Sequence, residues 1–246
     1  MFWQHGAQKL FGFFGGEPAP PFTLLWFAGA AEFLGAIAMA VGFLTRLFSV
    51  ILAVDMAVLY LTRYVTLGAP IRNYDGEVAC ILFLIASLLV FTGPERFSIE
   101  GIFKQRPSGP PSLPDGAVLG IFRILVGLLF VQHGLQKVFG MLGGELYEFP
   151  NMRWFAGMIE LFGGPIIALG LLTRPIAFLL CGEMAFAYFI NHNYRSFWPI
   201  QNLGERAVLF CYIYLFLVTV GPGKFSLDGV LWPKRARSEE PVILRN

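Results

Sequence analysis

Two hydrophobic stretches of the sequence carry a histidine, a glutamine and a lysine at the same spacing. The residues are His133, Gln136 and Lys137 in the second half of the chain, and His5, Gln8 and Lys9 near its start. Positions i, i+3 and i+4 lie on one face of a helix, so each set forms one polar patch. An imidazole changes charge near neutral pH, and a lysine can neutralise a carboxylate or bind an anion. The combination indicates proton transfer beside a bound polar group.

Acidic and amide residues in the neighbouring hydrophobic stretches extend each set. They are Glu160, Glu183, Asn202 and Glu205 in the second half, and Glu32, Asp55, Asn73 and Glu77 in the first. Ionisable groups at membrane depth cost about 2.5 to 3.5 kcal/mol each on insertion scales, so they normally pair or line a cavity. We expect Lys137 to pair with Glu160 or with Glu183.

Two interpretations of these residues remain open at this point. In the first, they form a structural ion-pair network that locks helices together. In the second, they form a polar pocket where a quinone or a small anion is bound and protonated, with His133, Lys137 and Glu160 as the chemically active groups. Their mates His5, Lys9 and Glu32 take the same roles in the first half, and the remaining residues bind the substrate or quinone. No metal site is predicted, and haem is not favoured because each half supplies one histidine to its set.

The composition requires a membrane protein. The chain has 246 residues, of which 56% are apolar and 14% are charged, whereas a soluble domain carries about 25% charged residues. The length leaves room for about seven or eight helical spans. A net charge of +2 gives no support for nucleic acid binding. The three cysteines, Cys80, Cys181 and Cys211, form no CxxC motif, so no dithiol relay is predicted.

The chain is an internal duplication with a shift of 128 residues. FWQHGAQKLFGFFGGE at 2–17 returns at 130–145 as FVQHGLQKVFGMLGGE, with 11 of 16 positions identical, which is too many for chance. We expect a first repeat over 1–105, a Pro/Gly/Ser-rich linker over 106–116, a second repeat over 117–232 and a tail over 233–246. Hydrophobic segments are expected at 22–44, 47–66, 77–93, 117–142, 154–172, 175–190 and 204–221. The segment before Gly15 is about 14 residues, or about 21 Å, too short to cross a 30 Å hydrocarbon core alone.

An even number of helices in each repeat predicts two parallel four-helix repeats related by a pseudo-two-fold axis along the membrane normal. Ten lysines and arginines, among them Arg46, Arg174 and Arg235, fall on one side, against four on the other. The positive-inside rule therefore predicts a cytoplasmic linker and C-terminus, with the polar sets in the outer half of the bilayer. Arg123, near the inner end of its helix, is expected to snorkel to the interface.

Several stretches resemble the DoxX family of four-helix membrane proteins. They are LGIFRILVGLLFVQHGLQKVFGMLGG at 119–144, WFAGMIELFGG at 154–164, LGLLTRPIAFLL at 169–180 and GERAVLFCYIYLFLVTVGPGKFSLD at 204–228. The resemblance covers nearly the whole chain, and its clan includes the DoxD-type subunit of thiosulfate:quinone oxidoreductases. It implies an all-α protein of the inner membrane with a quinone-linked redox role and a redox partner subunit. It also implies that His133, Gln136, Lys137 and Glu160 are the family's polar motif positions, as are their mates.

The chain departs from that pattern in two ways. It is a tandem arrangement, whereas the DoxD form is a single unit, and no DoxA-like soluble portion is visible, so a sulfur compound is one substrate option among others. The alternative functions are a non-catalytic membrane scaffold and a small-solute carrier with the same residues lining a path. Besides membrane lipid, a second copy of the chain is an expected kind of partner.

Overall fold

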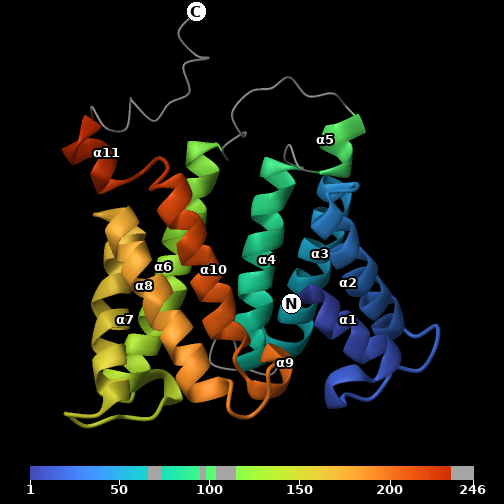
Figure 1. The fold of residues 1–246 in the computed structure, drawn as a ribbon, viewed down its shortest axis with the longest axis horizontal. Coiled ribbons are helices and arrows are strands. Elements are labelled where there is room, and N and C mark those ends of the chain that lie inside the picture. The colour runs from blue at the N-terminus through green and yellow to red at the C-terminus, as the bar shows by residue number, and fades with distance from the viewer. Residues whose placement is uncertain (66–73, 95–97, 104–114, 234–246) are drawn as a thin grey trace, which may run out of the picture. The chain divides into compact units, whose positions relative to one another are not determined.

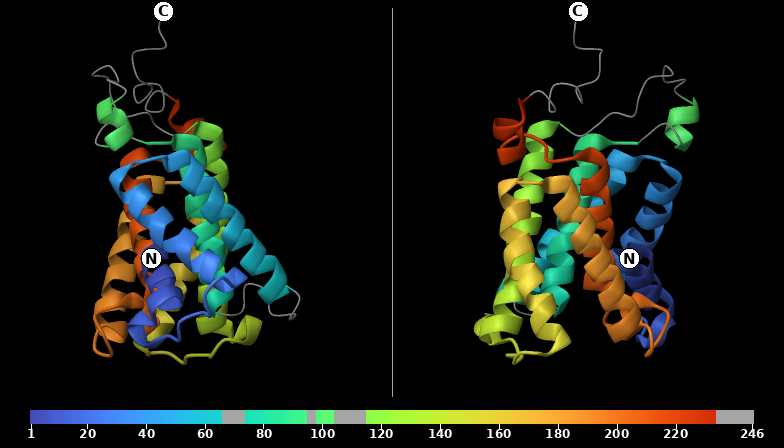
Figure 2. Two further views of the ribbon diagram at one scale, coloured as in Figure 1. Left: turned by 90° about the vertical axis from the view of Figure 1, so that its right-hand side faces the viewer. Right: turned by 60° about the vertical axis from the view of Figure 1, so that its left-hand side comes forward.

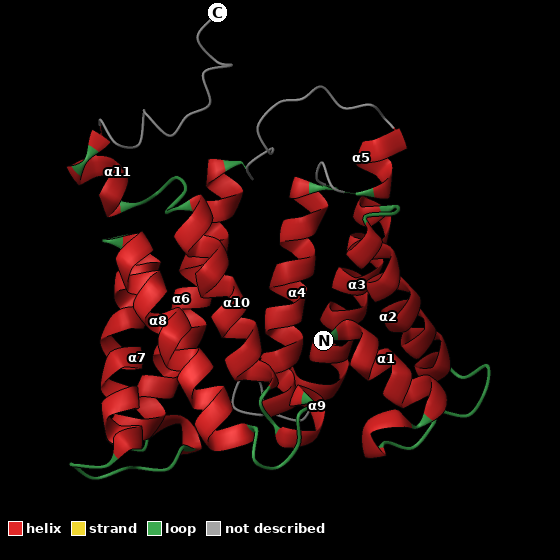
Figure 3. Cartoon of the chain, in the orientation of Figure 1, coloured by secondary structure: helices red, strands yellow, loops and turns green. Residues whose placement is uncertain are grey.

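The computed structural model describes residues 1–65, 74–94, 98–103 and 115–233, and all regular structure within them is helical (Figures 1 and 3). The chain divides into two compact units. Unit 1 comprises Met1–Ser112 with Ala187–Leu209, and unit 2 comprises Leu113–Phe186 with Phe210–Asn246. The predicted site residue Asn73 and residues 106–114 of the predicted linker lie outside the described residues.

The helices of unit 1 have the following bounds: α1 (Phe2–Phe11), α2 (Leu24–Val41), α3 (Thr45–Leu59), α4 (Tyr74–Thr92), α5 (Ile99–Phe103) and α9 (Pro199–Asn202). Unit 2 contains α6 (Gly116–Phe139), α7 (Met152–Leu169), α8 (Thr173–Ala187) and α11 (Leu227–Leu231). The helix α10 (Glu205–Val220) begins in unit 1 and continues into unit 2. Both α3 and α8 continue into a π-helical turn, at Tyr60–Val65 and Tyr188–His192.

Six helical segments of the described chain are long and apolar enough to cross a membrane. They are Leu24–Val41, Thr45–Arg63, Tyr74–Thr92, Gly116–Phe139, Met152–Leu169 and Thr173–His192. This confirms the prediction of an all-α, multi-pass membrane protein. The sequence analysis predicted seven or eight spans rather than six, because it also counted α10 as a span and α1 as an incomplete one. These helices have 16 and 10 residues, about 24 and 15 Å at the helical rise.

The backbone repeats itself with the shift seen in the sequence. Residues with positive φ recur 128 positions apart in the connections between helices. The pairs are Gly12 and Gly140, Phe14 and Leu142, Gly15 and Gly143, Gly42 and Gly170, Leu44 and Leu172, and Gly93 and Gly221. The glycines that follow α1, α2, α6 and α7 are left-handed C-caps, a conformation that costs a residue without Cβ little. The two repeats therefore end their helices in the same way.

Glycines allow α6 and α7 to pack closely and antiparallel (Figure 2). A Cβ atom on Gly127 would lie 2.7 Å from both the Ala168 nitrogen and the Gly164 oxygen, so a side chain would push the backbones apart. Near the other end of the contact, a Cβ on Gly157 would lie 2.6 Å from the Cβ of Lys137. Small residues at such contacts are typical of helix pairs in membranes. The close approach sets the register that brings the lysine of α6 to the middle of α7.

Arg123 of α6 does not snorkel, contrary to the sequence prediction. Its side chain is fully buried, and its guanidinium donates to the carbonyl oxygens of Pro222 and Phe225 at 2.8 Å and of Ala168 at 3.3 Å. The loop after α10 supplies two of these acceptors, which a reading of the helix alone does not reveal. Arg123 therefore fastens that loop to the α6–α7 pair.

The compact units do not coincide with the sequence repeats between Ala187 and Leu209. That segment belongs to the second repeat by sequence and packs in unit 1. The ring of Trp198 contacts the rings of Trp3 at 5.6 Å and Phe14 at 5.4 Å between centroids, which anchors the segment on α1 and on the short turn after it. Glu205 consequently lies beside His5 and Tyr74 of the first repeat, whereas the hydrogen-bond partners of Asn202 belong to its own repeat.

Candidate functional site

The candidate site in unit 2 contains an ion pair between α6 and α7. The Nζ atom of Lys137 donates to Oε1 of Glu160. The side chain of Glu160 is 2% exposed, while that of Lys137 is 27% exposed. The predicted pairing of Lys137 with Glu160 is thus confirmed. The second oxygen of Glu160, Oε2, is buried and accepts no hydrogen bond among the described residues.

A second carboxyl group, that of Glu183, lies beside this pair and forms no hydrogen bond to any described residue. Glu183 of α8 is within electrostatic range of both Glu160 and Lys137. Both of its carboxyl oxygens are buried, and within the described residues neither forms a hydrogen bond. A buried polar group left unsatisfied costs about 1 to 3 kcal/mol, and more for a charged one, so this carboxyl needs a proton or a polar ligand.

Tyr214 of α10 adds a further unsatisfied group, beside Glu160 and Glu183. Its side chain is fully buried, its hydroxyl has no hydrogen-bond partner in the described chain, and it lies within electrostatic range of Glu183 and Glu160. Buried tyrosine hydroxyls are usually bonded, so this one is an exception that requires a reason. We name Lys137, Glu160, Glu183 and Tyr214 the unit 2 cluster.

Aromatic rings from α6 and α10 border the unit 2 cluster. The Phe130 ring lies 4.9 Å from that of Phe210 and 5.0 Å from that of Tyr214, between centroids, both edge to face. The imidazole of His133 lies 5.9 Å from the Phe210 ring and 6.2 Å from the Phe130 ring. His133, the predicted proton-transfer residue, therefore lies against the rings of Phe130 and Phe210, on which the ring of Tyr214 also packs.

Unit 1 repeats the lysine–glutamate pair between α1 and α2. Lys9 Nζ donates to Glu32 Oε1 at 2.5 Å, and the Glu32 side chain is 1% exposed. Asp55 of α3, the mate of Glu183, lies within electrostatic range of both. Its Oδ2 atom is buried and has no hydrogen-bond partner among described residues. The duplicated sequence therefore produces duplicated pairs with a nearby acidic group.

The remaining acidic residues form a second network in unit 1. His5 Nε2 and Glu205 Oε1 are 2.8 Å apart, and Arg206 donates to Glu77 Oε2 at 2.9 Å. Arg206 also lies over the ring of Tyr74, 4.4 Å from its centroid. The backbone N–H of Glu205 donates to the Tyr74 hydroxyl at 3.0 Å. Sequence analysis placed Glu205 with the polar set of its own repeat, whereas in the structure it binds the histidine of the other repeat.

Three predicted binding residues are engaged in turns. The fully buried Asn202 donates to Ser196 O at 2.7 Å and accepts from the Gly204 N–H at 2.8 Å. Gln8 and Gln136 lie against Gly16 and Gly144, which follow the short helical turns after α1 and α6. These contacts hold the connections between helices, so the structure gives the three residues a positioning role.

The sequence matches the family model named DoxX over residues 1–65 and 118–193, more than half of the chain. The chain belongs to the DoxX family. The two separate matches contain both copies of the His-x-x-Gln-Lys pattern and both partner glutamates, Glu32 and Glu160.

Curated relatives of this DoxX protein each match about half of it. An uncharacterized protein of Haemophilus influenzae is 38% identical over 123 residues, which are 47% of this chain and 92% of the relative. An uncharacterized membrane protein of Mycobacterium tuberculosis is 30% identical over 138 residues, 49% of this chain and 81% of the relative. The inner membrane protein YqjF of Escherichia coli is 29% identical over 124 residues, 48% of this chain and 95% of the relative. No solved structure matches this chain.

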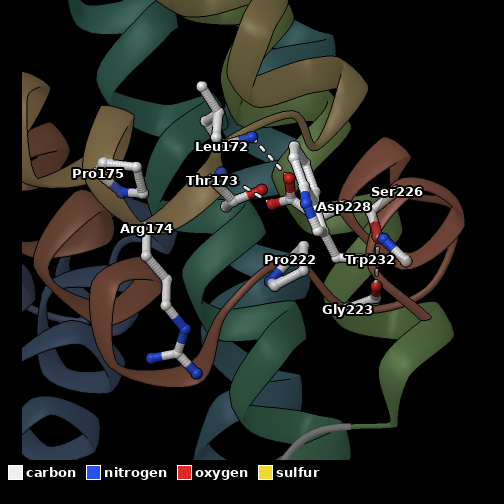
Figure 4. A pocket seen from close by; sticks show the side chains of 10 residues that line it. Leu172, Thr173, Arg174, Pro175, Pro222, Gly223, Ser226, Asp228 and Trp232 are labelled. Atoms are coloured by element: carbon white, nitrogen blue, oxygen red, sulfur yellow. Dashed lines mark hydrogen bonds between the residues drawn. The ribbon is translucent and has the colours of Figure 1, made fainter. Parts of the chain in front are cut away.

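A cavity of about 420 Å³ in this DoxX protein lies between the α7–α8 connection and the segment that follows α10 (Figure 4). Asp228 crosses it and accepts the N–H groups of Leu172 at 2.6 Å and Thr173 at 2.9 Å. The corresponding residue in unit 1, Glu100, accepts the Thr45 N–H at 3.1 Å. These carboxylates satisfy the free N–H groups at the starts of α8 and α3. We therefore assign them a structural role.

Sequence analysis missed several residues that matter in this arrangement. Tyr214 and Arg206 were absent from the predicted site because neither repeats at the shift of 128. The pair Glu100 and Asp228 was detectable, since it ends the recurring FSIE and FSLD stretches. The sequence predicted no dithiol because the three cysteines form no CxxC motif, yet the Sγ atoms of Cys181 and Cys211 lie 3.6 Å apart. Within the described chain, no group of three or more His, Cys, Asp or Glu residues is arranged to hold a metal ion.

Proposed function

We propose that this DoxX protein is an inner-membrane component of a quinone-linked redox system, and that the unit 2 cluster binds the quinone head group. One observation carries the proposal: the Tyr214 hydroxyl and the Glu183 carboxyl are buried and lack hydrogen-bond partners among described residues, beside an ion pair. A site with unsatisfied donors and acceptors is complete when a polar ligand binds. The name of the E. coli relative supports the inner membrane as the location.

The residues present fit a quinone head group. The aromatic rings nearest the cluster, those of Phe130, Phe210 and Tyr214, are buried, and the Phe130 ring packs edge to face on the other two, so the flat ring of a quinone would enter beside them as these side chains move. A quinone also has carbonyl oxygens that accept hydrogen bonds, and Tyr214 and Lys137 supply an O–H and an N–H donor. When bound, a quinone supplies two-electron chemistry coupled to two protons. Its isoprenoid tail requires lipid, which surrounds the spans of a membrane protein.

Within this proposal each residue has a separate task. Tyr214 donates to a carbonyl oxygen and fixes the orientation of the ring. Glu183 holds or receives a proton, because its two oxygens are unengaged. Lys137 and Glu160 keep the site electrically balanced, and His133, against the Phe130 and Phe210 rings, passes protons to or from it. The mates Lys9, Glu32 and Asp55 repeat the lysine, glutamate and acidic group in unit 1.

A membrane scaffold is the second candidate, and unit 1 favours it. There His5 bonds Glu205, Arg206 bonds Glu77, and Lys9 bonds Glu32, so ion pairs connect helices throughout the unit. A scaffold needs these pairs for assembly and stability alone. The two candidates differ in what they require of Tyr214, because a hydroxyl that bonds no described residue adds no hydrogen bond to a scaffold.

The test is the binding of a short-chain ubiquinone analogue to the full chain in lipid nanodiscs. Tyr214→Phe removes one donor, so we expect affinity to fall about five- to tenfold, equivalent to one hydrogen bond of about 1 to 1.4 kcal/mol. Glu183→Gln and His133→Ala should slow quinone reduction in native membranes. The matched control is Thr45→Val in unit 1, which removes a buried hydroxyl that likewise has no hydrogen-bond partner among the described residues. Unchanged binding in Tyr214→Phe, with only thermal stability affected in His133→Ala and Glu160→Gln, selects the scaffold.

A further inference from the structure

Two thiols meet between neighbouring helices in unit 2. Cys181 of α8 and Cys211 of α10 have their Sγ atoms 3.6 Å apart and form no disulfide. A disulfide requires an S–S distance of about 2.0 Å. The two sulfurs are therefore in contact and need to approach by a further 1 to 2 Å, roughly, to form a bond, a movement within the reach of side-chain rotation.

The register of the two helices produces this contact. Arg174 at the start of α8 donates to Val218 O at 2.7 Å and Thr219 O at 2.9 Å on α10. Seven residues further along α8 and seven residues back along α10 are the two cysteines, two turns away in an antiparallel pair. The position of the sulfurs thus follows from how the helices are held.

The thiol pair is specific to the second repeat. The residues that align with Cys181 and Cys211 at the shift of 128 are Ala53 and Phe83. The equivalent helices of the first repeat therefore pack without a cysteine at either position. The third cysteine, Cys80 of α4, is a single thiol in unit 1 and provides an internal comparison.

The surroundings of the pair indicate that its reaction partner is dissolved in lipid. Both cysteines are partly exposed, and their neighbours Phe178 and Tyr212 are 71% and 67% exposed on the surface of the two helices. Gly182 follows Cys181, and a Cβ atom added there would meet no side chain or other backbone of the described chain within 4 Å. In a membrane protein such a surface faces acyl chains, so hydrophobic reagents reach it more readily than aqueous ones.

The same two helices carry the quinone-binding groups proposed above. Tyr214 lies three residues after Cys211, at the i, i+3 spacing that makes helix positions neighbours, and Glu183 lies two residues after Cys181, within one turn of α8 but on another face of it. The thiols and the cluster are thus within about one helical turn of each other along each chain segment.

We propose that Cys181 and Cys211 form a redox-active dithiol that passes two electrons to a membrane quinone. This step rests on the proposed function. Each thiol loses one hydrogen, and an S–S bond forms between Cys181 and Cys211. The two electrons and two protons released reduce one quinone to one quinol. Reduction of the disulfide by a thiol or another sulfur compound, in a separate half-reaction, returns the dithiol.

The experiment uses the reduced full chain in lipid nanodiscs under anaerobic conditions. A short-chain ubiquinone analogue is added, quinol is followed by absorbance, and the thiols are mapped by alkylation and mass spectrometry without reductant. We expect one quinol for each disulfide, and a cross-linked peptide pair containing Cys181 and Cys211. Cys181→Ser and Cys211→Ser should each slow quinol formation at least tenfold, whereas Cys80→Ser should leave it unchanged.

A membrane-permeant oxidant, 4,4′-dithiodipyridine, separates the outcomes. A Cys181–Cys211 disulfide with this oxidant but none with quinone overturns the assignment of the electron acceptor and so the proposal. Mixed disulfides at each cysteine without a cross-link overturn the dithiol itself. Tyr214→Phe and Glu183→Gln with wild-type quinone binding and a wild-type rate of quinol formation would contradict the proposed quinone site, while leaving the dithiol in place.

Discussion

Removal of the lysine from the Lys137–Glu160 pair should destabilise the protein more than removal of the glutamate. Lys137→Met leaves the carboxylate of Glu160, which is 2% exposed, without its cation. Loss of one partner of a buried pair costs about 3 to 5 kcal/mol. Glu160→Gln leaves a lysine that is 27% exposed and whose long side chain can move its charge toward water, so we expect a loss of about 1 to 2 kcal/mol. The double variant leaves no unpaired charge and should lie within about 1 kcal/mol of the native protein.

The assay is the free energy of unfolding in mixed detergent micelles, with each variant compared in the same preparation. Lys9→Met is the matched control in unit 1, because Lys9 is 19% exposed and its partner Glu32 is 1% exposed. It should lose about as much stability as Lys137→Met. A loss below about 1 kcal/mol in Lys137→Met, or a double variant no more stable than Lys137→Met, would refute the charge-pair reasoning.

Three further predictions follow from other parts of the chain. Arg123→Leu should cost about 2 to 4 kcal/mol of unfolding free energy and expose the loop after α10 to proteolysis, because three carbonyl oxygens lose a donor; wild-type protease resistance would contradict this. The Ala117 N–H, and then the charge of Lys224, lower the pKa of Asp115, so its stabilising effect is present above the unfolded value of about 3.9 and lost as the pH falls through the folded value. Asp115→Asn should therefore melt below wild type at about pH 6 and together with it at about pH 2, and an equal difference at both pH values would be inconsistent with the charge effect. The excess of basic residues on one side predicts a cytoplasmic C-terminus. A green fluorescent protein fused to the C-terminus should therefore fluoresce, and an alkaline phosphatase fused there should be inactive. The opposite result would reverse the predicted topology.

The local features of this fold were predictable from sequence. The shift of 128 identified the duplicated helix ends, and the positive φ angles at Gly42 and Gly170 are its structural counterpart. The ion pair between Lys137 and Glu160 was predicted because a lysine and a glutamate at membrane depth strongly favour pairing. The glycines of α6 and α7 let the two helices approach closely enough for the pair to form. Such features depend on residue type and on contacts between consecutive helices.

Contacts between distant segments could not be predicted in the same way. Glu205 bonds His5 across 200 residues of sequence, and Arg123 bonds a loop about 100 residues away. Periodicity shows which face of a helix is apolar, but it does not show which distant segment covers that face. The Cys181–Cys211 contact was missed for the same reason, since only helix register brings these thiols together.

The central claim is that the unsatisfied groups of the unit 2 cluster bind a quinone, and Tyr214→Phe tests it most directly. The hydroxyl bonds no group in the described protein, so its removal should leave stability unchanged or raise it by up to about 1 kcal/mol. Binding of a ubiquinone analogue, measured on the same nanodisc samples, should weaken about five- to tenfold relative to wild type and to Thr45→Val. Quinone affinity equal in all three proteins would contradict the account.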